Sequence, residues 1–187
     1  DGALTFKIEP ASALPFNLMI RIPGWAQNKA MPSDLYSFAE NSTQSTTIKI
    51  NGQNAVYSMK AGYAVLNKIW KKGDVVQVNF PMEVRQLVAN KNIKDDIGKV
   101  AIQRGPLIYC AEWPDNFGKA SNIIVPPDAV FIPEYKPGML HGITVLKSNL
   151  PAVVISNDST VSTVKQPFTA IPYYAWAHRG KGEMTIW

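Results

Sequence analysis

The residues best suited to chemistry gather in one short stretch near the middle of the chain. It contains Cys110, the only cysteine, and the carboxylates Glu112 and Asp115. A thiolate is a strong nucleophile, and two carboxylates about 5 to 10 Å apart can act as acid and base in a hydrolysis. Either chemistry depends on the elements that position these side chains.

Cys110 is interpreted as a buried, inert thiol on a strand. A nucleophilic cysteine needs a neighbouring base or a helix N-terminus that lowers its pKa. His141 and His178 are distant from it in sequence, and no triad partner stands beside it. One cysteine, with two histidines that lack ligand spacing, also predicts no metal site and no internal disulfide.

The two carboxylates have two interpretations. Glu112 and Asp115 flank Trp113 in a loop that leaves a strand, where the carboxylates could meet a substrate and the indole could stack on a sugar. Alternatively, the loop is a turn in which Asp115 and Asn116 bind backbone groups, as Asp and Asn side chains commonly do. The residue types favour the turn.

The elements that hold this stretch are predicted to be strands. Residues 100–103 run into the Gly105-Pro106 corner, and the apolar residues 107–111 leave it. Apolar and polar residues alternate in many other places, among them 4–8, 16–22, 48–50 and 76–80. No segment has helical periodicity. The sequence therefore predicts an all-β fold of antiparallel, jelly-roll-like β-sandwiches.

Two polar segments interrupt the strands. Residues 26–45 are rich in Ser, Asn, Thr and Gln and are predicted to form a long loop or a short helical turn. Residues 90–98 are the second break and the candidate domain boundary. We therefore expect two small packed sandwiches, the first in residues 1–95 and the second in residues 96–179.

Composition excludes several classes of protein. The 187 residues carry a formal net charge of +5, but the lysines and arginines are scattered. Because no basic helix, zinc-finger spacing or RNA-binding strand motif accompanies them, a solvated surface explains the charge better than a nucleic-acid partner. No segment approaches the roughly 20 apolar residues of a membrane span. The start at Asp1, without Met or a leader, is typical of a piece trimmed from a longer protein.

A set of ordered stretches resembles one family, glycoside hydrolase family 127, whose best-known members are β-L-arabinofuranosidases. Each stretch is weak alone, but together they extend over nearly the whole chain. They are Leu18–Trp25, Ile50–Gly52, Gly62-Tyr63, Trp70, Gly73-Asp74, Phe80–Arg85, Arg104–Glu112, Ile171–Trp176 and Arg179-Gly180.

The resemblance implies that this chain is the β-region of a larger enzyme. In the family an (α/α)-barrel precedes that region and holds the catalytic residues and a zinc site made of one Glu and three Cys. None of these matches a residue here, so no catalytic residue is carried over, and zinc is expected only in the absent barrel. The resemblance also implies that residues 180–187 rejoin the first sandwich.

The same resemblance suggests the partners. The chain's own barrel would be one, and a plant-type, arabinose-containing glycan would be the substrate of the parent enzyme. Analogy with glycan-degrading relatives favours a periplasmic or secreted parent.

Aromatic residues provide the remaining candidate contacts. Tyr173, Tyr174 and Trp176 form a run that is too aromatic for a free loop, and we expect it to pack against the barrel. Trp25 follows a Pro-Gly turn at a strand end, where a core contact and a sugar contact are both open.

The leading hypothesis is a non-catalytic accessory region that braces the barrel and forms a homodimer interface. The rival is an autonomous carbohydrate-binding module that uses Trp113 or Trp25 as its platform.

Overall fold

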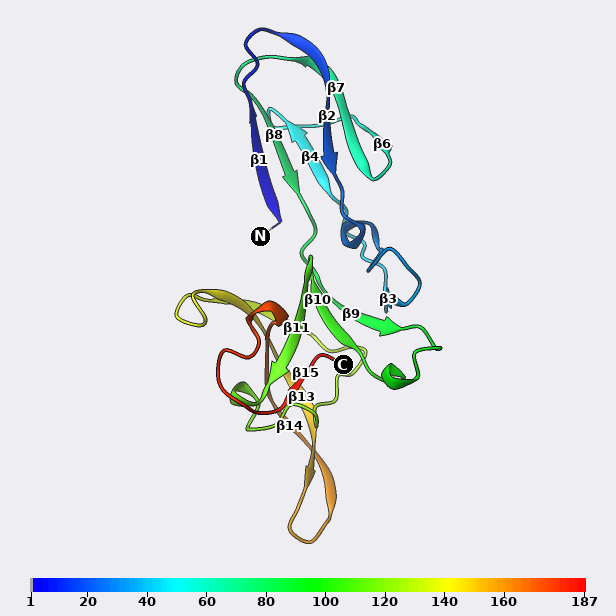
Figure 1. Ribbon diagram of the computed structural model, residues 1–187, viewed down its shortest axis with the longest axis vertical. Helices are drawn as coiled ribbons and strands as arrows, with labels where there is room; N and C mark the ends of the chain where they lie inside the picture. The colour runs from blue at the N-terminus through cyan, green and yellow to red at the C-terminus, as the bar shows by residue number, and fades with distance from the viewer. Residues whose placement is uncertain (1) are drawn as a thin grey trace. The chain divides into compact units, whose positions relative to one another are not determined.

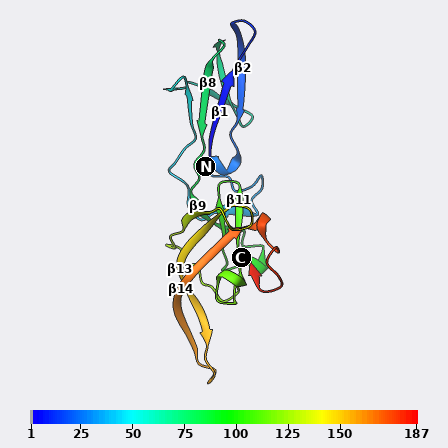
Figure 2. The same ribbon diagram turned by 90° about the vertical axis from the view of Figure 1, so that its left-hand side faces the viewer.

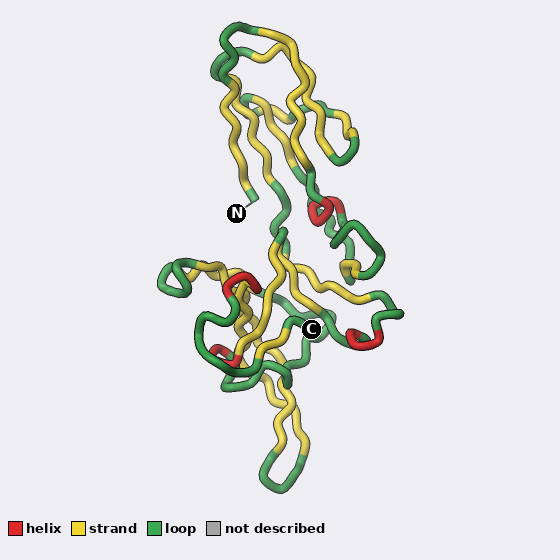
Figure 3. The backbone as a smooth tube through the Cα atoms, in the orientation of Figure 1, coloured by secondary structure: helices red, strands yellow, loops and turns green. Residues whose placement is uncertain are grey.

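The computed structural model describes residues 2–187. These residues divide into two compact units, and the boundary along the chain lies between Glu83 and Val84. Strands and short 3-10 turns make up the regular secondary structure of the described residues, as Figure 3 shows. The hydrogen-bonded strand pairs are antiparallel. The prediction of an all-β, antiparallel fold is confirmed.

The first unit is a two-sheet sandwich. One sheet has the strand order β1 (Ala3–Ile8), β8 (Asp74–Asn79), β4 (Thr47–Ile50) and β5 (Gln53–Asn54). The other has the order β2 (Leu14–Arg21), β7 (Tyr63–Trp70) and β6 (Ser58–Lys60). Apolar side chains from both sheets meet in one core, among them Ile20, Leu66, Trp70, Ile48, Val76 and Val78. Alternating apolar residues thus face inward from each sheet.

The segment predicted as a loop or helical turn, residues 26–45, lies within the first unit. It begins within the 3-10 turn η1 (Gly24–Gln27), and its one strand is the short β3 (Tyr36–Phe38). Its polar composition, with few alternating apolar positions, explains why it contributes little to the sheets.

The second unit is built on a sheet with the order β12 (Ile132–Lys136), β13 (Ile143–Ile155), β14 (Val161–Pro172), β11 (Leu107–Glu112), β10 (Ala101–Arg104) and β9 (Val84–Ala89). Figures 1 and 2 show the long β13–β14 hairpin from two sides. Buried side chains form separate clusters, one including Tyr109, Leu146 and Phe168, the other including Cys110 and Ile171. Loops and 3-10 turns complete this unit.

The structure differs from the predicted domain limits. Residues 90–98, expected to separate the sandwiches, join β9 to β10, which pair as Ala101 with Leu87 through Arg104 with Val84. They are therefore a hairpin loop inside the second unit, with the short turn η2 (Lys94–Asp96). A polar loop between paired strands has the same composition as a linker, so composition alone misplaced the boundary.

The closing segment also differs from the expectation that residues 180–187 rejoin the first sandwich. The strand β15 (Met184–Thr185) pairs with β11, with Thr185 opposite Ala111 and Met184 opposite Glu112. Because β10 pairs only with the first half of β11, the second half has an open edge that β15 occupies. This return brings the chain's last residues against the stretch that holds the candidate site.

Candidate functional site

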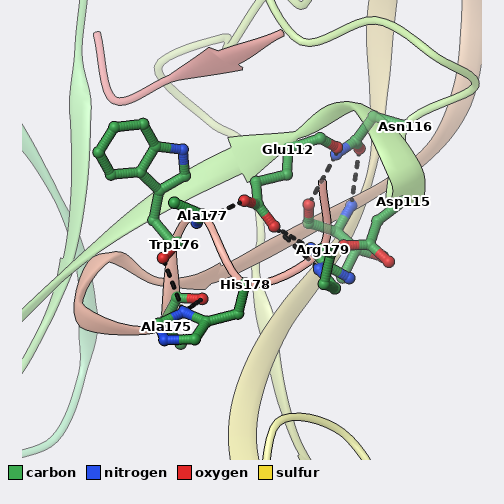
Figure 4. A network of polar contacts seen from close by, with 9 residues as sticks. Glu112, Asp115, Asn116, Ala175, Trp176, Ala177, His178 and Arg179 are labelled. Carbon is green, nitrogen blue, oxygen red and sulfur yellow. Dashed lines mark hydrogen bonds and ion pairs between the residues drawn. The ribbon is translucent and has the colours of Figure 1, made fainter. Parts of the chain in front are cut away.

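An ion cluster lies where β11 ends, and Figure 4 shows its members. Arg179 Nε donates a hydrogen bond of 2.9 Å to Glu112 Oε2, and its Nη2 contacts the same oxygen. The same Nη2 donates to Asp115 Oδ2 at 2.6 Å. One guanidinium therefore joins both candidate carboxylates.

The buried position of Glu112 indicates that this ion cluster supports the fold. The Glu112 residue is only 4% exposed, and its Oε1 accepts a hydrogen bond of 3.2 Å from the backbone N–H of Ala177. Burial lowers the pKa of Arg179, but its hydrogen bonds to Asp115 and Glu112 outweigh this effect and raise it. Both carboxylates thus bind a permanent cation and tie residues 177–179 to β11, which favours support over acid–base catalysis.

Asn116 holds the other side of the loop. Its side chain is fully buried, and its Nδ2 donates to the backbone oxygens of Glu112 at 2.8 Å and Thr169 at 2.9 Å. Its Oδ1 accepts from the Thr169 N–H at 3.0 Å. The Asn116 amide thus makes hydrogen bonds to the backbone of the loop and of β14. The turn interpretation of this residue predicts such bonds to backbone groups.

Trp113 begins the 3-10 turn η3 (Trp113–Asp115) and is half-buried. Its ring lies against Gly182, where an added Cβ would stand only 2.0 Å from the ring. Its backbone N–H donates to the Glu183 carbonyl at 3.0 Å. The indole is therefore covered by the returning C-terminal segment and is not a free platform for sugar.

Cys110 is 1% exposed and lies on β11. Burial, with a smaller contribution from Glu112, raises the pKa of its thiol to about 12. At neutral pH the sulfur carries its proton, so the interpretation as an inert buried thiol fits the structure. No three His, Cys, Asp or Glu side chains of residues 2–187 gather as metal ligands.

Trp25 belongs to the first unit and lies on η1. It packs edge-to-face on Phe80, with ring centroids 5.6 Å apart, and contacts the sandwich core. The half-buried residue also lines an open hollow of about 560 Å³ with Arg21, Gln27 and Lys29 among its neighbours. Trp25 therefore packs against the core of the first unit and also lines a hollow on its surface.

The aromatic run at the end of β14 is exposed, and we call Tyr173, Tyr174 and Trp176 the aromatic patch. The three residues are 42%, 64% and 41% exposed. The rings of Tyr173 and Trp176 stack with their centroids 5.8 Å apart and their planes 13° apart. His178 Nδ1, 2.8 Å from the Trp176 carbonyl oxygen, donates to it and secures the following turn (Figure 4). A preformed, uncovered aromatic surface is typical of a contact site.

Sequence reasoning missed the residues that complete the ion cluster and its surroundings. Arg179 was noted only as part of a family stretch, and Gly182 and Glu183 were not noted. Glu183 accepts hydrogen bonds from the N–H groups of Ala120 at 2.9 Å and Ser121 at 3.3 Å. A carboxylate in an apolar strand requires a partner, which is the one sequence signal that pointed to a distant cation.

Family models match the chain in two parts. A model of the middle domain of family 127 β-L-arabinofuranosidases matches residues 1–82, and a model of the C-terminal domain of the family matches residues 84–187. The chain belongs to glycoside hydrolase family 127. The two matched ranges coincide closely with the two units of the structure.

Relatives within family 127 are considerably longer. A non-reducing end β-L-arabinofuranosidase of Bifidobacterium longum subsp. longum is 30% identical, and the match includes 100% of this chain but 28% of that protein. A solved family 127 β-arabinofuranosidase is 39% identical with a TM-score of 0.94, over 100% of this chain and 29% of the other. The Geobacillus stearothermophilus T6 family 127 β-L-arabinofuranosidase is 36% identical with a TM-score of 0.86, over 100% and 28%. The chain thus spans less than a third of these relatives.

The family 127 chain has no helix in residues 2–187 that is long and apolar enough to cross a membrane.

Proposed function

We propose that this chain is a non-catalytic accessory region that packs against the catalytic part of a β-L-arabinofuranosidase-like glycoside hydrolase. The observation that carries the proposal is the aromatic patch, three large rings left exposed in a chain that spans less than a third of its relatives. Clusters of exposed aromatic residues act as anchors in protein interfaces. The buried ion cluster beside the patch fixes the segment that carries it.

The parent reaction follows from the relatives' names. In the proposal, the parent hydrolyses a terminal β-L-arabinofuranosyl linkage of an arabinose-containing glycan, and the zinc and catalytic residues lie outside these 187 residues. The role of this chain is then to support the fold and the substrate entrance of the catalytic part. In the proposal, the loop at Asp115 is the segment of this chain that touches the catalytic part near the substrate entrance.

Assembly from two pieces tests the proposal. The catalytic part and the 187-residue chain are produced separately and mixed, and binding is measured by analytical ultracentrifugation. We expect a complex that is weakened at least tenfold when Tyr174 and Trp176 are both changed to Ser. The change Phe117→Ser is the matched control, because Phe117 is 71% exposed and lies outside the patch. Absence of a complex, or equal weakening by the control, contradicts the proposal.

The second candidate function is glycan binding at the hollow beside Trp25. An aromatic ring next to amide and cationic side chains, here Gln27, Arg21 and Lys29, is chemistry that suits a sugar. Calorimetric titration of the chain with arabinan tests it, and binding that the change Trp25→Ala abolishes would support it. Flat titrations across several plant polysaccharides would remove this candidate.

A homodimer is a further proposal for the parent. The β13–β14 hairpin supports it, because its outer residues Ile155 and Val161 are 69% and 66% exposed. Sedimentation equilibrium of the intact enzyme decides between a monomer and a dimer.

A further inference from the structure

The residues that line the hollow beside Trp25 carry a net positive charge. Arg21 and Lys29 are among them, and no Asp or Glu occurs among the described residues of this lining. Within residues 2–187 neither cation forms an ion pair. All the lining residues belong to the first unit. A hollow lined by charge of one sign attracts a ligand of the opposite sign.

Arg21 is held in a fixed position at this hollow. Its guanidinium carbon lies 5.3 Å from the centroid of the Tyr63 ring, and its Nη1 donates to the Ala61 carbonyl oxygen at 3.3 Å. Gly62 permits this approach, because a Cβ at that position would stand 2.8 Å from Nη1. A guanidinium has five N–H donors in a planar fork. Donors therefore remain for a ligand and are already positioned.

Lys29 is brought to the hollow by the turn that follows η1. Asn28 ends the 3-10 turn in the left-handed conformation, with a φ of 59°. The chain then folds back, and the Lys29 N–H donates to the Gly24 carbonyl oxygen at 2.9 Å. The Asn28 Oδ1 accepts from the Ser42 N–H at 2.8 Å. Hydrogen bonds thus fix the backbone that carries Lys29 close to Trp25.

The other groups that line the hollow suit a sugar better than a bare ion. The half-buried Trp25 offers an indole ring, on which the apolar face of a sugar can pack. The Gln27 Nε2 donates to the Ile22 carbonyl oxygen at 2.7 Å, which orients the amide so that its oxygen can accept from a hydroxyl group. The volume of about 560 Å³ lies within the range of small-molecule sites.

We propose that this hollow binds an acidic sugar, a uronic acid residue of a glycan. The carboxylate is bound by Arg21 and Lys29, and the sugar ring packs on Trp25. A carboxylate has two acceptor oxygens and forms strong, charge-assisted hydrogen bonds with guanidinium and ammonium groups, whereas a neutral arabinose unit has no charge to match theirs. The site rests on glycan binding at this hollow, the second candidate function, and specifies the class of glycan.

Titration with two forms of one polymer tests the site. Polygalacturonate and its fully methyl-esterified form share the sugar and the linkage, but only the first carries carboxylates. We expect calorimetry to show that the 187-residue chain binds polygalacturonate at least about tenfold more tightly. Equal binding of the two polymers overturns the acidic specificity and leaves glycan binding standing, whereas absence of binding to either polymer overturns both.

Single substitutions test which cations bind the carboxylate. Arg21→Gln and Lys29→Gln should each weaken the binding of polygalacturonate by about fivefold. Lys72→Gln is the matched control, because it removes the same charge from an exposed residue that does not line the hollow, and it should leave binding unchanged. Because Lys29 is exposed, its variant tests the site independently of any effect of the Arg21 change on the turn at Ala61.

Two outcomes of these substitutions contradict the site. Equal weakening in Lys72→Gln would mean that the polymer is attracted by net charge alone. Unchanged binding in Lys29→Gln and Arg21→Gln would mean that the carboxylates are bound elsewhere on the chain.

Discussion

At the scale of single residues, one guanidinium decides what the most reactive-looking stretch of the chain does. Arg179 binds both Glu112 and Asp115, the residues that a glycosidase would need to keep separate. The neighbouring thiol of Cys110 is buried, with a pKa of about 12. Residues suited to catalysis are here used to hold the returning C-terminal segment.

Removal of the guanidinium should be strongly destabilising. The change Arg179→Met leaves the buried Glu112 carboxylate without its cation, which costs about 3 kcal/mol of unfolding free energy. Urea denaturation followed by tryptophan fluorescence measures the loss. The exposed Lys119, whose Nζ lies 3.9 Å from Glu183, provides the control, and Lys119→Met should change little. Similar losses in both variants would show that the cluster has no special role.

The packing of Trp113 makes a second prediction for a single residue. The change Gly182→Ala puts a methyl group 2.0 Å from the indole, so the ring or the backbone must move. Overpacking of this kind costs about 1 to 3 kcal/mol. The control is Gly138→Ala, since a Cβ at Gly138 meets nothing within 4 Å. A Gly182 variant as stable as the Gly138 variant in urea would mean that the indole is not held where the structure has it.

At the scale of elements, two turns of the first sandwich are joined by Asp74. The Asn51 side chain donates to Asp74 Oδ1 at 2.8 Å, and the Lys71 N–H donates to Oδ2 at 2.9 Å. These hydrogen bonds, with that of Asn51 the larger contribution, lower the pKa of Asp74 to about 2. The carboxylate therefore connects the turn that begins β8 to the turn between β4 and β5.

This pKa predicts how stability depends on pH. Because the folded pKa lies below the ordinary value of about 4, the stabilisation is present above pH 4 and is lost as the pH falls towards 2. We expect the melting temperature to decline over that range and the decline to be smaller in Asp74→Asn. The decline that remains in Asp74→Asn is expected from Glu183, whose pKa is also lowered to about 2, mainly by the hydrogen bond from the Ala120 N–H. An unchanged pH profile in Asp74→Asn would contradict this role.

The β13–β14 hairpin should be stable along only part of its length. Its inner residues, such as Leu146 and Leu150, are buried, while the outer residues Ile155 and Val161 are exposed. A two-stranded ribbon without a packed face is marginally stable, so amide hydrogen exchange at residues 154–162 should be faster than at 146–150. Equal protection along the whole hairpin would contradict this expectation.

The sequence predicted local features better than strand partners. Asn51-Gly52 does connect two paired strands, with Ile50 opposite Gln53, and Gly105 takes the positive φ of 55° that a two-residue hairpin turn needs. Both features depend on adjacent residues. The pairing of β15 with β11 and the contact of Arg179 with Glu112 depend on residues more than sixty positions apart, about which alternation of apolar residues carries no information.

At the scale of the whole molecule, the two units match the middle and C-terminal domains of family 127. Three observations agree on an accessory role: the carboxylates are bound to Arg179, the thiol is buried, and the aromatic patch is uncovered. The first two leave residues 84–187 without an available acid, base or nucleophile at this site. The third provides the surface through which the chain would bind the rest of an enzyme.

The most direct test of the central claim is the glycosidase activity of the purified 187-residue chain. An aryl β-L-arabinofuranoside is incubated with the chain, with and without added zinc, and release of the aryl group is compared with that of the intact enzyme. We expect no release above the uncatalysed rate under either condition. Zinc-dependent release of sugar by the chain alone would contradict it.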